Sequence, residues 1–87
     1  MKPKQIKEYF VKALKTNDVL YIDIKDNYFV EIGTYAEKDL WNACLGETDT
    51  NENGKVLIQV ERDTWESALE GLLFYISRID KFSSLLS

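Results

Sequence analysis

The string DTNENG at residues 49–54 comes closest in this sequence to a recognisable site for chemistry. Oxygen-bearing side chains at alternate positions, followed by a glycine that permits a sharp turn, form the first half of a calcium-binding loop. The second half is missing, because the position of the bidentate carboxylate is Val60 and Glu61 falls one residue late. We therefore predict a polar surface loop over residues 47–54 and no bound metal.

Histidine is absent from the sequence, which removes the commonest general base and metal ligand. The single cysteine, Cys44, rules out an internal disulfide, and no base is identifiable beside it, so we predict a small buried hydrophobe. Two pairs of carboxylates are close in the predicted elements, but such pairs are common in an acidic chain. They are Asp23 with Glu31 and Glu61 with Asp63. We predict that the protein is not an enzyme and holds no cofactor.

Length and composition predict one globular domain over residues 1–87. Hydrophobic residues make up 45% of the chain and aromatic residues 13%, which is enough to form a core. No apolar run is long enough to span a bilayer and no signal-peptide pattern is present, so we expect a cytoplasmic protein without a membrane partner. The net charge of −4 is uneven: residues 1–16 hold five lysines and one glutamate, whereas residues 17–87 hold fourteen acidic and six basic residues.

The stretch 55–86 is the element around which the rest of the chain is organised. Residues 56–61 alternate as a strand, with Val56, Ile58 and Val60 on one face. A long helix begins at Asp63, with Glu66 completing a capping-box-like pair. One helical stripe then faces the core: Trp65, Leu69, Leu72, Ile76 and Ile79.

A first helix begins near Pro3, and its lysines fall mostly on the face away from the apolar stripe. We interpret this face as a solvated one, with contact to phosphate or a membrane surface as the alternative. The residues of the apolar stripe are Ile6, Tyr9, Phe10, Ala13 and Leu14.

A β-hairpin is predicted over residues 19–32, and its register follows from the apolar residues. A two-residue turn at Asp26-Asn27 would mix the faces, whereas a three-residue turn over 25–27 places all six apolar residues on one side. Such a turn needs a left-handed residue, and Asn27 tolerates that conformation. The aligned pairs are Leu20 with Ile32, Ile22 with Val30, and Ile24 with Tyr28; the other face carries Val19, Tyr21, Asp23, Phe29 and Glu31.

Thr34 and Glu37 form a second capping box, which predicts a short helix over residues 34–45 that ends at Gly46. Its inner face carries Leu40, Trp41, Cys44 and Leu45. The predicted fold is α+β, in the order α-β-β-(short α)-β-α. A three-stranded, mainly antiparallel sheet carries helices on one face. Without the short helix this order resembles that of double-stranded-RNA-binding domains. The acidic body lacks the basic second helix that such domains place on phosphate, so we predict no direct nucleic-acid binding.

Two functions from different classes remain. The first is a non-enzymatic acidic module that binds a basic, nucleic-acid-binding surface of another protein; in size and charge the chain resembles small acidic phage proteins that block restriction or CRISPR nucleases. Its binding residues are predicted to be Asp23, Asp26, Glu31, Glu47, Asp49, Glu52, Glu61 and Asp63.

The alternative is a structural or assembly subunit that forms a homodimer through the back face of the last helix. Phe74 and Arg78 lie on that face, beside the small residues Ser67 and Gly71. If the protein does not self-associate, the predicted short helix would cover Phe74. Salt should weaken the acidic interaction and leave a largely apolar one intact.

Overall fold

The computed structural model describes residues 2–15, 19–35, 40–49 and 52–86, with the backbone alone described at 19, 35, 49, 52 and 53. The α+β class predicted from the sequence is confirmed. The elements are α1 (Pro3–Ala13), β1 (Val19–Lys25), β2 (Tyr28–Tyr35), β3 (Leu40–Asp49), β4 (Glu52–Arg62), α2 (Trp65–Arg78), α3 (Asp80–Ser83) and a final 3-10 turn (Ser84–Leu86).

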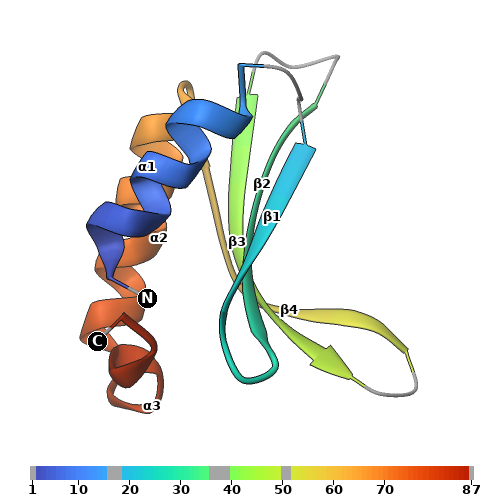
Figure 1. The fold of residues 1–87 in the computed structure, drawn as a ribbon, viewed down its shortest axis with the longest axis vertical. Coiled ribbons are helices and arrows are strands. Elements are labelled where there is room, and N and C mark those ends of the chain that lie inside the picture. The colour runs from blue at the N-terminus through green and yellow to red at the C-terminus, as the bar shows by residue number, and fades with distance from the viewer. Residues whose placement is uncertain (1, 16–18, 36–39, 50–51, 87) are drawn as a thin grey trace.

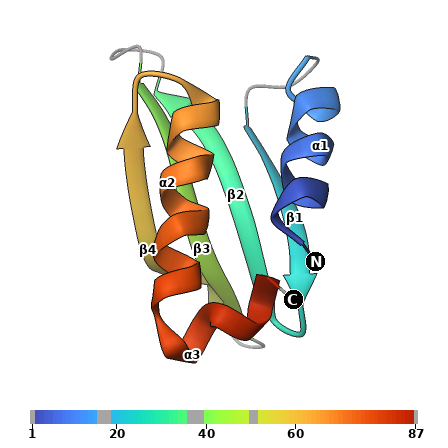
Figure 2. The same ribbon diagram turned by 90° about the vertical axis from the view of Figure 1, so that its left-hand side faces the viewer.

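The four strands form one antiparallel sheet in the order β1-β2-β3-β4, so each strand pairs with the next one along the chain. The helices cover one face of this sheet (Figure 1), and α1 and α2 lie side by side on it (Figure 2). The other face carries no helix in the described part of the chain, and we call it the open face.

The predicted short helix is wrong, because residues 40–45 belong to β3. The run Leu40-Trp41-Asn42-Ala43-Cys44-Leu45 fits both a helical stripe and an alternating strand. Pairing with strands on both sides decides for the strand, which buries Ala43 and Leu45 completely. Thr34, predicted as a helix cap, lies in β2 and its hydroxyl donates to the Leu40 carbonyl at 3.2 Å; Glu37 lies outside the described residues. Within the described residues the sheet therefore has four strands and not three.

The predicted loop 47–54 is also largely strand, since it forms the ends of β3 and β4. A register shift after Leu45 changes the predicted alternation of β4. Beyond that bulge Val56 is 53% exposed, whereas Leu57 packs against the core. A bulge places two residues opposite one, so the faces of the strand exchange beyond it.

The predicted pairs Leu20–Ile32 and Ile22–Val30 are confirmed. The turn is wrong in detail, because a bulge between Asp23 and Lys25 lets Lys25 face Tyr28 and leaves a two-residue turn. Asp26, not Asn27, adopts the left-handed conformation, with φ of 50°. The bulge absorbs the extra residue that would otherwise have mixed the two faces of the hairpin.

The core lies between the helices and the sheet. Side chains with no exposed surface come from both helices and from the central strands: Ile6, Phe10, Val30, Ile32, Ala43, Leu45, Ala68, Leu69, Leu72 and Ile76. The centre of the stripe predicted for the last helix is therefore confirmed, but its end is not. Ile79 is 39% exposed and extended, with φ −95° and ψ 113°. The chain turns there, so that α3 brings Phe82 back against Tyr28, with ring centroids 6.1 Å apart.

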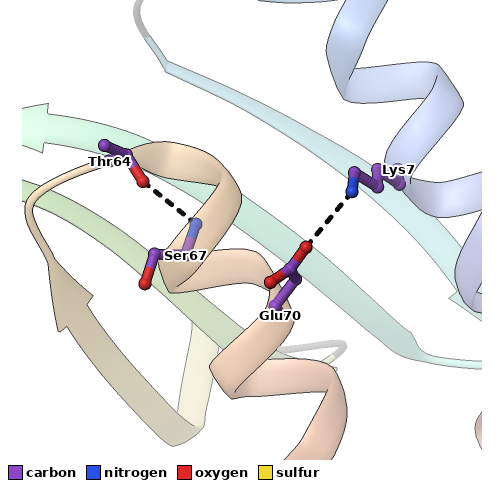
Figure 3. Close-up of polar contacts among 4 residues, drawn as sticks. All are labelled: Lys7, Thr64, Ser67 and Glu70. Carbon is purple, nitrogen blue, oxygen red and sulfur yellow. Dashed lines mark hydrogen bonds and ion pairs between the residues drawn. The ribbon is translucent and has the colours of Figure 1, made fainter.

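The N-terminus of α2 gives a prediction about stability. The N-cap is Thr64, not the predicted Asp63, and its Oγ1 accepts a hydrogen bond from the Ser67 amide at 3.2 Å (Figure 3). Thr64→Ala should lower the free energy of unfolding by about 1 kcal/mol, because that amide loses its partner. Urea denaturation measures the loss. Ser67→Ala is the control, since it keeps the amide donor, and equal losses in both variants would contradict the capping role.

Candidate functional site

The β1–β2 hairpin places aromatic and acidic side chains on the open face. Leu20, Ile22, Val30 and Ile32 pack in the core, so the residues that alternate with them point the other way. On β1 these residues are Tyr21 and Asp23, and on β2 they are Phe29 and Glu31. Tyr21 is 59% exposed, and its ring meets that of Phe29 edge to face with centroids 6.1 Å apart.

The β3–β4 hairpin curls over one end of the open face. Figure 1 shows the far ends of β3 and β4 bending away from the helices. Two register shifts in this hairpin, at Leu45/Gly46 and at Glu47/Asp49, accompany the bend. The pairing of β2 with β3 keeps one register up to the β1–β2 turn, where the Thr48 amide donates to the Asn27 carbonyl at 2.6 Å.

The Phe29 ring lies over two glycines of the curled hairpin. A Cβ atom on Gly46 would lie 2.6 Å from Cε1 and 2.7 Å from Cε2 of that ring. A Cβ atom on Gly54 would lie 2.7 Å from Cε1. Because neither glycine has a side chain, the ring of Phe29 occupies the space beside the backbones of β3 and β4.

A hollow of about 440 Å³ opens where these parts meet. Three of the eight predicted acidic residues line it, together with both aromatic rings, and no lysine or arginine of the described residues does. Its lining residues are Tyr21, Asp23, Asp26, Asn27, Phe29, Glu31 and Thr48. We call this the acidic hollow. Its arrangement suits a cationic group, because carboxylates supply charge and the rings supply an apolar, electron-rich wall.

Three of the other five predicted acidic residues do not line the acidic hollow. Glu47 faces Tyr28, and the hydrogen bond between them raises the pKa of the Tyr28 phenol; partial burial and the charges of Glu47 and Asp26 add to this. Glu61 on β4 lies opposite Asn42 on β3, and Asp63 follows β4. Both acidic residues are exposed. The side chains of two further residues lie outside the described part: Asp49 and Glu52.

Sequence reasoning did not assign Tyr21, Phe29, Asn27 or Thr48 to a site. The strand alternation already placed the two aromatic residues on the same face as Asp23, so that signal was available. Thr48 carried no such signal, because residues 47–54 were predicted to be a loop. Its position follows from the pairing of β3 with β2.

Cys44 lies on β3 between Glu31 and Gln59 of the neighbouring strands and is 3% exposed. Burial raises the pKa of its thiol from 9.0 to about 11, and the charge of Glu31 adds to this increase. The thiol is therefore protonated at neutral pH. A folded-state pKa above the unfolded value also means that stability from this group is complete below pH 9 and declines as the pH rises toward about 11.

The reactivity of Cys44 gives a second prediction. At pH 8 the folded protein should react with iodoacetamide at least about 100-fold more slowly than the urea-unfolded chain, because the raised pKa lowers the thiolate fraction and burial blocks access. Mass spectrometry at timed intervals measures the rate. Rapid labelling of the folded protein would show an accessible, reactive thiol instead.

The back face of α2 is exposed at Phe74, whose side chain is 54% exposed. The short helix that was predicted to cover Phe74 does not form, since residues 40–45 belong to β3. The Arg78 guanidinium lies 5.0 Å from the centroid of the Phe74 ring, so these two predicted residues do contact each other. Gly71 was predicted beside them but faces the sheet, because a Cβ atom there would lie 3.1 Å from Cγ1 of Val60.

Within residues 2–15, 19–35, 40–49 and 52–86, no group of three or more potential metal ligands is found. None of the described helices has the length and hydropathy needed to cross a membrane. Comparison of the chain with protein-family models, with curated proteins and with solved structures gives no match.

Proposed function

We propose that this protein is a small acidic binding module whose open face occupies a basic surface of another protein. Our specific proposal is an inhibitor that covers a surface that otherwise holds nucleic acid. One observation carries the proposal: Asp23, Asp26 and Glu31 share a single hollow with the rings of Tyr21 and Phe29. Composition alone favours an acidic module, and the hollow supplies a place for it to bind.

The charges in the acidic hollow are uncompensated within the described part of the chain. The one ion pair found among the described residues joins Lys7 to Glu70, and it lies on the helical side of the sheet. Like charges held together repel, and a cationic partner relieves that repulsion while it gains attraction from each carboxylate. The acidic hollow would therefore favour fast, salt-sensitive association with a lysine- or arginine-rich surface.

The aromatic rings favour arginine among the cations that could enter. A guanidinium is planar, so it can stack on a ring while its donors reach carboxylates on either side. Tyr21 is 59% exposed and offers such a face.

Capture at two salt concentrations tests this proposal. Tagged protein is incubated with nuclease-treated lysate and washed at low and then at high salt, and the captured protein is identified. We expect a nucleic-acid-binding protein that is shed at high salt and for which this chain competes with an oligonucleotide. A partner that survives high salt and still binds its oligonucleotide would contradict the proposal.

The assembly alternative predicts a different result in the same experiment. An interface around Phe74 would be largely apolar, and its retention would change little with salt. The species retained at high salt would then be an untagged copy of the chain itself.

A further inference from the structure

We propose that the groove between α1 and α2 binds an acidic amphipathic helix of a partner protein. This groove lies on the opposite side of the molecule from the acidic hollow, so the inference does not depend on the proposed function. It rests on the shape of the groove, on the apolar side chains that line it and on the lysines along its rim.

The groove runs between two neighbouring, antiparallel helices (Figure 2). Lys7 Nζ lies 3.2 Å from Glu70 Oε1 and bridges the helices near the middle of the groove (Figure 3). On one side of this bridge the start of α1 faces the later part of α2; on the other side, the end of α1 faces the start of α2. The bridge therefore divides the groove into two hollows, which we call the Phe74 hollow and the Val11 hollow.

Both hollows are lined mainly by apolar side chains. The Phe74 hollow measures about 460 Å³, and Leu69, Leu73 and Leu86 also line it. The Val11 hollow measures about 530 Å³ and includes Trp41 and Trp65. Phe74 is 54% exposed and Val11 43% exposed, so apolar surface is left uncovered in both. Uncovered apolar surface of this kind, rimmed by charges, is typical of an interaction site.

Charge complementarity selects an acidic occupant. Lys4 and Lys7 line the Phe74 hollow, Lys7 and Lys15 line the Val11 hollow, and Lys12 lies beside Val11 on α1. The acids along the groove are Glu66 and Glu70, and Glu8 lies beside Lys12 on α1, so four lysines face three glutamates. Lys7 already pairs with Glu70. This is a basic rim on a chain whose net charge is −4.

The shape selects a helix. Two apolar hollows separated by one bridge match apolar side chains at helical spacing, with acidic residues of the same helix lying toward the lysines. A flat bilayer would not reach into the hollows. A two-fold dimer through this groove would bring the lysines of two α1 helices into one interface, which costs free energy by like-charge repulsion.

The test uses a fluorescein-labelled synthetic peptide with leucines at helical spacing and glutamates at the remaining positions. Fluorescence anisotropy at low salt should show saturable binding, although the protein has the same net sign as the peptide. Lys4→Glu with Lys12→Glu should raise the Kd at least about tenfold, and Phe74→Ala should raise it about tenfold. Lys25→Glu with Lys55→Glu and Val56→Ala are the matched controls, since these residues are exposed outside the groove, and each should change the Kd less than about twofold.

Several results would overturn the inference. One is a peptide that binds no better than its scrambled form; another is equal weakening by the groove and control variants. A third is a dimer, detected by light scattering, that Phe74→Ala dissociates. Retention on anionic vesicles that depends on the same lysines, without peptide binding, would assign the groove to a membrane surface. Amide variants of Asp23, Asp26 and Glu31 should leave peptide binding intact, which separates this test from that of the proposed function.

Discussion

Asp23→Asn, Asp26→Asn and Glu31→Gln, combined in one variant, should weaken binding to the captured basic partner about 100-fold at low salt. Each exposed charge pair at an interface contributes on the order of 1 kcal/mol, and about 3 kcal/mol corresponds to about 100-fold in Kd. Amides keep the shape of the side chains, so the fold should be retained. Isothermal titration calorimetry against the purified partner measures the change, and the salt dependence of Kd should fall with it.

A second triple variant separates the acidic hollow from net charge. Glu8→Gln, Glu66→Gln and Asp80→Asn remove the same number of charges from exposed positions on the helices. This variant should weaken binding less than about threefold, because screening limits the effect of distant charges. If both variants weaken binding equally, attraction depends on overall charge and the acidic hollow has no special part in it.

Gly46→Ala should lower the free energy of unfolding by about 2 kcal/mol, a typical cost of inserting a methyl group into filled space. The new Cβ atom would lie 2.6 Å from Cε1 and 2.7 Å from Cε2 of Phe29. The ring has little room to slide toward Gly54, because a Cβ atom at that position would also lie 2.7 Å from Cε1. Urea denaturation measures the loss. A displaced ring would also reshape the acidic hollow, so partner binding should weaken in the same variant.

A double-mutant cycle identifies the cause of this destabilisation. In a Phe29→Ala background the ring is gone, and Gly46→Ala should then be nearly neutral, with a coupling free energy of about 1–2 kcal/mol. An equal loss in both backgrounds would place the cost in the backbone of β3 and not in the ring.

The elements that could be predicted were those with one strong pattern. In α1, Ile6 and Phe10 recur at helical spacing, and both are fully buried. In the first hairpin, opposing apolar residues fixed the pairing of Ile22 with Val30. Residues 40–45 had two patterns, and the apparent capping box at Thr34 favoured the wrong one. Pairing with β2 and β4 stabilises residues 40–45 as a strand, and the local sequence does not show that these two strands lie beside it.

The acidic hollow could be predicted in part for a similar reason. Strand alternation already placed Asp23 and Glu31 on the outer face of the first hairpin with Phe29. The bend of the β3–β4 hairpin depends on two bulges, and their positions follow from packing across the sheet. The pairing of β2 with β3, which the predicted helix at 40–45 excluded, places Thr48 beside Asn27 and Glu47 opposite Tyr28. The sequence pattern alone therefore could not predict which acidic residues after Gly46 lie near the acidic hollow.

Amide-resolved NMR titration of the intact protein with an arginine-rich peptide tests the central claim most directly. We predict chemical-shift changes concentrated at Tyr21, Asp23, Phe29, Glu31 and Thr48, because these residues line the acidic hollow. Raising the salt concentration should reverse the changes. Shifts spread evenly over the exposed acids of the helices, or centred on Phe74 and Arg78, would contradict the claim that the open face is the binding surface.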